Sequence, residues 1–245
     1  MEIKQGRDME KKELISYLEK DKIRNLNLLN FIKGYSYSSV EKAGESISVK
    51  GKSDRNWVFF SSKSDEEFKT LIEKLSSEDE NLSGLEDWML SILYRKYEFE
   101  WRLSCERLIY PDNIKLDHPH FETRDLTERD AAYIYEKSRY GKYLRIEYVT
   151  DRIKNGLSLG IDIDGCLAAW IMTHDDGSIG FLNVLEEHRR KHIGYDITLS
   201  MIKRMRQLKK IPFVHIESDN ISSINLSRKA GFDYDRNIHW VKILK

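Results

Sequence analysis

Apolar and polar positions alternate along the second half of the chain in a regular series of strands and helices. The pattern predicts strands over Phe121–Arg124, Ser158–Asp162, Cys166–Thr173, Ile179–Leu185, Phe213–Glu217 and Ile238–Leu244. It predicts helices from Thr127, over about Tyr143–Lys154, after the basic turn that follows Leu185, and over Asn220–Lys229, which Gly231 closes. Asp164-Gly165 suits a hairpin turn with positive φ, so we expect two of these strands to pair antiparallel.

The first half predicts fewer elements. A helix is expected over Met9–Phe31, strands over Ser46–Lys50, Trp57–Ser61 and Tyr97–Tyr110, a helix capped by Ser64, and another whose apolar face carries Leu85, Trp88, Met89, Ile92 and Leu93. Pro111-Asp112-Asn113 and Asp117-His118-Pro119-His120 then interrupt the pattern. We place a domain boundary there, which gives domains over residues 1–117 and 118–245.

Composition removes several function classes. Lys and Arg number 41, as do Asp and Glu, so no global field favours nucleic acid or an anionic membrane. No apolar run approaches the roughly 20 residues of a membrane span, and the charged N-terminus lacks the core of a signal peptide. We therefore expect a cytoplasmic protein in which Cys105 and Cys166 are two buried thiols rather than a disulfide.

The most informative segment is the basic turn that follows the strand ending at Leu185. Arg189-Arg190-Lys191-His192 leads directly into an amphipathic helix. A helix start offers unpaired N–H groups and the positive end of the helix dipole, and the cations add charge. The segment thus predicts a phosphate site, although the same pattern also suits an ordinary strand–turn–helix unit with a solvated basic face.

Two motifs give the C-terminal half a resemblance to the GNAT superfamily of acyl-CoA-dependent N-acyltransferases. Arg189 to Gly194 resembles the superfamily's turn, with His192 where its first glycine is usual. Asn220 through Gly231-Phe232 resembles a second element. The whole chain is similar to the glycine N-acyltransferase-like branch, in which a degenerate N-terminal domain precedes the GNAT domain.

The resemblance implies an α/β (α+β) fold with a central mixed, mostly antiparallel sheet, preceded by a smaller GNAT-like α/β domain. It implies transfer of an acetyl or other short acyl group from CoA to a primary amine of a small molecule or amino acid, by direct attack in a ternary complex. No metal is implied, and we expect a monomer or homodimer. The CoA-binding residues would be Val184 and Leu185 for pantetheine, Arg189, Arg190, Lys191, His192, Ile193, Gly194 and Tyr195 for pyrophosphate, and Asn220, Ser223 and Ser227 for the thiol end.

The usual acid and base of the resembling family are missing from this sequence. Ser178 stands where many relatives have a glutamate base, and Ser227 stands where many have a tyrosine acid. Ser227 could still hydrogen-bond the CoA sulfur. Glu217, at the end of a strand, is our first candidate base, and a solvated carboxylate is an equal alternative. A non-catalytic acyl-CoA-binding or regulatory module, or an enzyme acting on a protein amine, stays open.

Other chemically suggestive residues have simpler interpretations. Asp175-Asp176-Gly177 is read as turn chemistry rather than a base, and Glu186 and Glu187 as partners of the arginines. His118 and His120 are read as linker residues, because no further metal ligand has suitable spacing. His215 is read as a core or surface histidine. The remaining pair, His239 and Trp240, lies on the last strand, where one of them could shape an acceptor pocket.

Overall fold

The computed structural model describes residues 9–138 and 145–245 as two compact units. One unit contains the chain up to Cys105 together with Asn237–Lys245, and the other contains Glu106–Arg236. We call them the N-terminal unit and the C-terminal unit. The division after Cys105 comes before the boundary that we expected at residue 117. The last residues of the chain, Asn237–Lys245, return to the N-terminal unit. Whether residues 1–117 and 118–245 fold separately stays a prediction.

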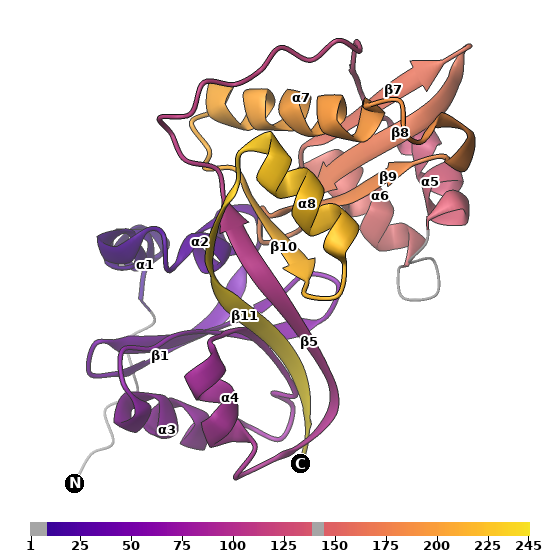
Figure 1. Ribbon diagram of the computed structural model, residues 1–245. Helices are drawn as coiled ribbons and strands as arrows, with labels where there is room; N and C mark the ends of the chain where they lie inside the picture. The colour runs from indigo at the N-terminus through magenta and orange to yellow at the C-terminus, as the bar shows by residue number, and fades with distance from the viewer. Residues whose placement is uncertain (1–8, 139–144) are drawn as a thin grey trace, which may run out of the picture. The chain divides into compact units, whose positions relative to one another are not determined.

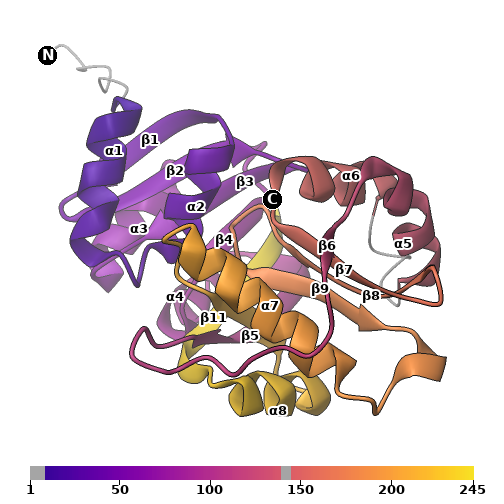
Figure 2. The ribbon, with the colours of Figure 1, turned by 90° about the horizontal axis from the view of Figure 1, so that it is seen from above.

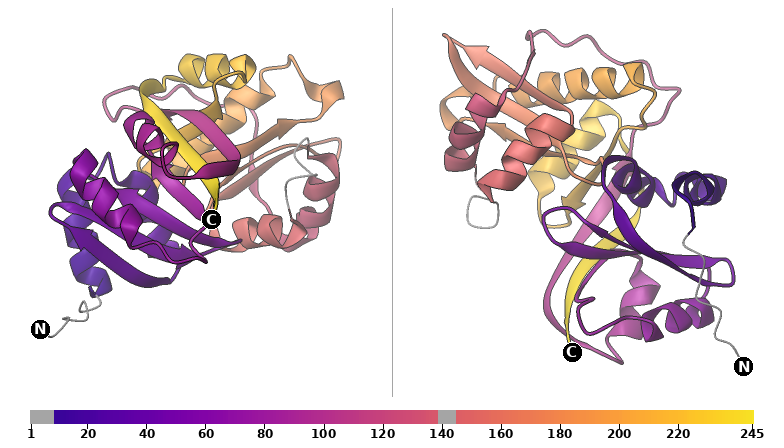
Figure 3. Two further views of the ribbon diagram at one scale, coloured as in Figure 1. Left: turned by 90° about the horizontal axis from the view of Figure 1, so that it is seen from below. Right: turned by 180° about the vertical axis from the view of Figure 1, so that it is seen from behind.

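In the N-terminal unit a sheet is covered by helices on both faces. Its elements are α1 (Lys11–Leu18), α2 (Leu26–Gly34), β1 (Tyr37–Ala43), β2 (Ser46–Lys52), β3 (Asn56–Ser61), α3 (Asp65–Glu73), β4 (Asn81–Leu85), α4 (Asp87–Leu93) and the start of β5 (Glu98–Ile109). The strand order is β1-β2-β3-β4-β11-β5, with β3 and β4 parallel. Helices α1 and α2 pack on one apolar cluster and α3 and α4 on another, on opposite sides of the strands (Figure 3).

The structure corrects three expectations for this unit. The helix expected over Met9–Phe31 is divided, because the Asn25 side chain donates to the carbonyl oxygen of Leu18 at 2.9 Å and ends α1. Strands β1 and β4 were not predicted. The second of them contains Leu85, which we had assigned to a helix, and α4 begins only after Glu86. Polar residues dominate β1, and β4 is five residues long, so neither has a strong period-2 pattern.

The C-terminal unit has the predicted series of elements. They are β6 (Arg124–Asp125), α5 (Ala131–Lys137), α6 (Ile146–Asn155), β7 (Ser158–Ile163), β8 (Cys166–Thr173), β9 (Ile179–Val184), α7 (Ile193–Gln207), β10 (Phe213–Glu217), α8 (Ile221–Ala230) and the start of β11 (Asp233–Leu244). The strand order is β11-β5-β10-β9-β8-β7-β6. The strand expected over Phe121–Arg124 is only two residues long, because its pairing is limited to Gly160 and Leu159 of β7. The part of the expected helix at residues 143–144 lies outside the described residues.

Two helix layers enclose the C-terminal sheet. Helices α7 and α8 cover one face and α5 and α6 the other, as Figures 1 and 2 show. The first layer buries Ile197, Met201 and Met205 against the sheet, and the second buries Ile134 and Val149. Burial of apolar side chains contributes most of the stabilisation of such a fold, at about 25 cal/mol per Å2 of apolar surface.

The order of elements in the N-terminal unit recurs in the C-terminal unit. Each has two helices, three strands, a helix, a strand parallel to the preceding one, a helix and a long strand. The long strands β5 and β11 each have residues in both units. The observed architecture is thus the mixed α/β fold with helices on a mostly antiparallel sheet that we expected.

The motif from Asn220 to Phe232 has a structural explanation in α8. Asn220 is the N-cap, and its side chain accepts a hydrogen bond from the Ser223 amide at 3.2 Å. Gly231 ends the helix with φ 104°, and the Phe232 amide then donates to the carbonyl oxygen of Ser227 at 3.0 Å. The motif therefore fixes the length of α8 at both ends.

Replacing Gly231 with alanine places a Cβ at a left-handed φ and 3.1 Å from the Tyr110 ring. We expect Gly231→Ala to lower the free energy of unfolding by about 1–2 kcal/mol in urea denaturation. Gly34→Ala is the matched control, because Gly34 ends α2 and a Cβ there meets nothing within 4 Å. The control should be neutral or stabilising by up to about 1 kcal/mol; an equal loss in both variants contradicts the explanation.

Candidate functional site

The turn between β9 and α7 begins at Leu185, whose backbone N–H and C=O groups are both hydrogen-bonded. The Leu185 amide donates to the carbonyl oxygen of Ala168 at 2.9 Å, and the Leu185 carbonyl accepts from the His188 amide at 2.9 Å. Because hydrogen-bonding direction alternates along a strand, Val184 and Leu182 direct their backbone groups away from β8. Of the two residues predicted to pair with pantetheine, Val184 has its backbone groups directed away from β8, whereas the backbone of Leu185 is used within the chain.

Two left-handed residues shape the turn. Arg190 and His192 both have φ 63°, and α7 starts at the next residue, Ile193. Left-handed residues next to a helix start gather successive N–H groups into a concave anion-binding turn. His192 thus has the conformation that glycine gives the resembling family at this position, at a cost that a glycine would avoid.

Cationic side chains surround this turn. Arg189 donates from Nε to the carbonyl oxygen of Val184 at 3.0 Å, and Lys191 donates from Nζ to that of Glu187 at 3.1 Å. These contacts differ from the carboxylate partners that we expected for the arginines. Arg190 is exposed, and Lys229 of α8, which the sequence reasoning missed, lies with Nζ 5.1 Å from the Tyr195 ring centre.

The first turn of α7 is anchored by its acidic and hydroxyl side chains. Tyr195 donates to the Asp117 carboxylate at 2.7 Å, and this hydrogen bond, with burial, raises the pKa of the phenol to about 12. The buried Asp196 carboxylate accepts from the backbone amides of His120 and Phe121 at 2.6 and 3.2 Å. The segment before β6 is thereby fixed along the helix, and the side chain of Tyr195 is used in this anchor.

The open edge of β9 faces the space beside this turn. Strands β9 and β10 lie wholly within the described residues, and they pair at one register position, Ile179 with Val214. Further along β9, Phe181 has φ 54°, and the register with β8 shifts between Trp170 and Met172. Such a bulge leaves one residue outside the ladder and re-aims the backbone there.

Helix α8 contributes the other predicted residues. Ser223 and Ser227 are spaced i, i+4 and share a face with Leu226 between them. A Cβ on Gly194 would lie 3.5 Å from the Val184 side chain and 3.7 Å from the Leu226 side chain. The end of β9, the start of α7 and the middle of α8 therefore meet around Val184, Gly194 and Leu226. Val184 and Gly194 are predicted CoA-binding residues, and Leu226 lies next to Ser223 and Ser227 on α8.

The predicted catalytic residues are placed less favourably. Glu217 is exposed at the end of β10, and Ser227 is buried on α8. Ser178 is buried at the start of β9, and its amide and hydroxyl donate to the Asp176 carboxylate at 2.9 and 2.6 Å. Asp176 forms turn contacts, as expected, but it also lies 3.4 Å from His215, which the sequence reasoning did not connect with it.

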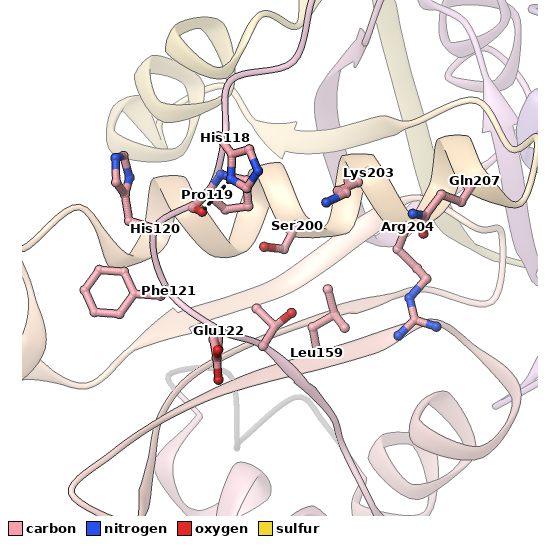
Figure 4. Close-up of a pocket in the computed structure, with 11 residues that line it drawn as sticks. His118, Pro119, His120, Phe121, Glu122, Leu159, Ser200, Lys203, Arg204 and Gln207 are labelled. Atoms are coloured by element: carbon pink, nitrogen blue, oxygen red, sulfur yellow. Dashed lines mark hydrogen bonds between the residues drawn. The ribbon is translucent and has the colours of Figure 1, made fainter.

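The segment with His118 and His120 lies along α7, where the His120 amide is held by Asp196. His118 and His120 line a cavity of about 400 Å3 between the segment before β6 and the flank of α7, where Lys203 and Arg204 also lie (Figure 4). None of the predicted CoA-binding residues lines it. His239 belongs to the N-terminal unit, where its ring contacts Asp87 and Ser104, both at 2.9 Å.

The described residues contain neither a cluster of metal ligands nor a membrane-spanning helix. Within residues 9–138 and 145–245, no group of three or more His, Cys, Asp or Glu side chains is arranged to hold a metal ion. Within the same ranges, no helix is long and apolar enough to span a membrane.

Comparison with known proteins shows the fold. The pattern of the FR47-like protein family matches residues 156–241. A Drosophila protein of known structure is 17% identical, with TM-score 0.80 over 97% of this chain and 98% of its own. A GCN5-related N-acetyltransferase-like protein from Streptococcus suis is 12% identical, with TM-score 0.56 over 96% and 98%. A GNAT-family acetyltransferase from Colwellia psychrerythraea is 11% identical, with TM-score 0.58 over both full chains. A search of curated proteins gave no match. The chain therefore has the GNAT fold.

His192 provides a test of the turn's conformation. We expect His192→Gly to raise the free energy of unfolding by about 0.5–1 kcal/mol, because glycine adopts φ 63° without strain. His192→Val should lower it by about 1 kcal/mol or more, since a β-branched residue is strongly disfavoured at this φ. Urea denaturation of the wild type and the two variants gives the order of their free energies of unfolding. A valine variant as stable as the glycine variant contradicts the left-handed assignment.

Proposed function

We propose that the C-terminal unit transfers an acetyl or other short acyl group from CoA to a primary amine of a small molecule or amino acid. The observation that carries the proposal is the left-handed turn before α7, placed at the end of a strand whose outer edge is open. A pyrophosphate needs many donors, and the N–H groups from Arg190 to Tyr195 with the flanking cations can supply them. The FR47-like match over residues 156–241 covers this same segment.

The open edge of β9 would hold the pantetheine arm. An extended amide chain adds to a free strand edge through main-chain hydrogen bonds, and Val184 directs its backbone groups there. Its carbonyl oxygen accepts from Arg189 at 3.0 Å in the structure, so this arginine would have to exchange that contact for phosphate when CoA binds. The bulge at Phe181 would place a backbone N–H near the thioester carbonyl, where it could stabilise a developing oxyanion.

Direct transfer then needs a group to take a proton from the amine and a donor for the thiolate. Glu217 and Ser227 stay our sequence-based predictions for these roles. The exposed carboxylate of Glu217 would attract an ammonium group, and the Ser227 hydroxyl would lie toward the thiol end. Both cysteines are free thiols, but only Cys105, in the N-terminal unit, is buried as expected; Cys166 is exposed at the start of β8. We assign neither a covalent role.

A second candidate function is an acyl-CoA-binding module without turnover. It is favoured by the serines at the two positions where the resembling family has its base and acid. Ser178 in particular is buried and donates to a neighbouring carboxylate, so it cannot accept a proton from an amine.

The N-terminal unit should not bind CoA at its equivalent helix. The first turn of α3 carries Asp65, Glu66 and Glu67, and the Glu67 carboxylate already accepts from the Glu45 amide and the Ser46 hydroxyl at 3.1 and 2.5 Å. Three carboxylates at a helix start repel a phosphate. Isothermal calorimetry with acetyl-CoA should therefore give one site per chain; two equal sites contradict this assignment.

Arg190 is the sharpest probe of the pyrophosphate site, because it is exposed and its backbone defines the turn. We expect Arg190→Gly, which keeps the left-handed φ and removes only the cation, to weaken acetyl-CoA binding by about tenfold, as loss of one charge-assisted contact does. The salt dependence of binding should also fall. Lys209→Gly, which removes a charge from another exposed left-handed residue (φ 55°) beyond the far end of α7, is the matched control.

A release assay for the CoA thiol against a panel of amines separates the two functions. Binding with thiol release supports acyl transfer, and binding without it supports the module. No binding of CoA or acetyl-CoA at millimolar concentration contradicts both. Cys166→Ala should keep its rate within about twofold, because no acyl-enzyme forms in direct attack.

A further inference from the structure

A buried carboxylate–imidazole pair lies where β9 and β10 part. Asp176 is 5% exposed and the His215 side chain 6%. Oδ2 of Asp176 lies 3.4 Å from Nδ1 of His215, while its Oδ1 accepts the two hydrogen bonds from Ser178. Both carboxylate oxygens are thereby held, and one of them is directed at the imidazole.

The pair lies next to the position where the strands separate. Val214 is the residue of β10 that pairs with Ile179, and His215 directly follows it. Val214 and Ile216 belong to the core cluster under α7, so the alternation of side chains along a strand puts His215 and Glu217 on the other face. Glu217, two residues further along β10, thus points outward from the same face of the sheet as His215.

The carboxylate of Asp176 also compensates for the unexpected serine at position 178. The Ser178 hydroxyl and the Asp176 carboxylate are 2.6 Å apart, so a carboxylate is present beside the start of β9 although residue 178 does not supply it. Two residues further along the strand, Gly180 leaves room for the His174 ring, whose Nε2 would lie only 2.2 Å from an added Cβ.

The charged groups around His215 keep its ring neutral. Burial lowers the pKa of His215 to about 4, with Asp176 and Asp235 opposing this and the buried Arg107 and His174 adding to it. Burial raises the pKa of Asp176, but the two imidazoles and the donors of Ser178 outweigh it and hold the pKa below its usual range. At neutral pH an ionised carboxylate therefore faces a neutral imidazole, with 3.4 Å between Oδ2 of Asp176 and Nδ1 of His215.

We propose that His215 is the proton acceptor for the attacking amine, and that Asp176 is the positioning residue that fixes its ring and tautomer. The proposal rests on the acyl transfer proposed above. It replaces Glu217 in that role and leaves Glu217 the task of attracting the ammonium form of the acceptor.

Proton transfer to His215 follows the attack of the amine. The neutral fraction of the amine attacks the thioester carbonyl, so a C–N bond forms and the nitrogen becomes positively charged. That nitrogen is far more acidic than the free ammonium, and it gives one proton to Nε2 of His215 as the C–S bond breaks. The electron pair leaves with the sulfur as CoA thiolate. The proton then passes from the imidazole to solvent or to the thiolate, which restores the neutral ring. A weakly basic imidazole suits this step, whereas it could not deprotonate an alkylammonium directly.

Kinetics with acetyl-CoA and a panel of glycine, glycinamide, benzylamine and a lysine-containing peptide tests the assignment. We expect His215→Gln to lower kcat by about 10²–10⁴-fold with the calorimetric Kd for acetyl-CoA unchanged, as loss of a general base does. Asp176→Asn should lower kcat by about tenfold or more and move the acid limb of the rate to lower pH, because the carboxylate that raises the His215 pKa is gone. His118→Gln, an exposed histidine, is the matched control.

A second measurement uses only the folded wild-type chain. In 15N NMR of labelled histidine, we expect His215 to stay neutral down to about pH 5, with the proton on Nδ1. A proton on Nε2, or a His215 pKa in the ordinary range, overturns the proposal even if no variant folds.

The outcomes separate this proposal from the proposed function. Failure of wild-type protein to bind acetyl-CoA rejects both. Turnover by the wild type with His215→Gln within threefold of it rejects only the His215 assignment. A pair that merely ties β10 to the preceding turn would change stability in both variants and leave the pH profile of kcat where it was. Acetyl-CoA binding without turnover of any amine in the panel also counts against the assignment.

Discussion

The parallel pairing of β9 with β10 at Ile179 and Val214 is the constraint on which the rest of the C-terminal unit depends. A parallel pair that continued would fill both edges of β9 with hydrogen bonds. Because the pairing stops at its first position, the backbone around Val184 keeps an open edge, and α7 starts beside it with its N–H groups directed outward. The same separation gives His215 a place between buried protein and the open side of the sheet.

Charge is used locally in this molecule. Its acidic and basic residues cancel in number, yet the turn before α7 gathers cations and α3 gathers carboxylates at the matching helix start. The N-termini of α3 and α7 occupy equivalent places in the two units, yet they carry side chains of opposite charge. Inside the C-terminal unit, the buried Arg107 guanidinium has the Asp235 carboxylate as its partner, whereas the buried Asp176 carboxylate lies beside the neutral ring of His215 and the donors of Ser178.

The sequence predicted most of the C-terminal unit, because its strands and helices have clear periods and its turns have diagnostic residues such as Asp164-Gly165. It predicted less of the N-terminal unit, where the polar strand β1 and the short strand β4 lack a period and Asn25 ends a helix through a side-chain contact. The phosphate turn could be recognised locally. The pairing of Asp176 with His215 could not, since it joins residues of two elements that only the folded sheet brings within 3.4 Å.

The return of residues 237–245 to the N-terminal unit has a consequence for synthesis of the chain. Strand β11 pairs with β4 through His239, Val241 and Lys242, and it lies between β4 and β5 in the strand order. The ribosome makes these residues only after the whole of the other unit. Until then the N-terminal sheet exposes an unpaired edge on β4, which is a template for pairing with another chain. The last strand of this sheet can therefore pair only after the C-terminal unit has been synthesised.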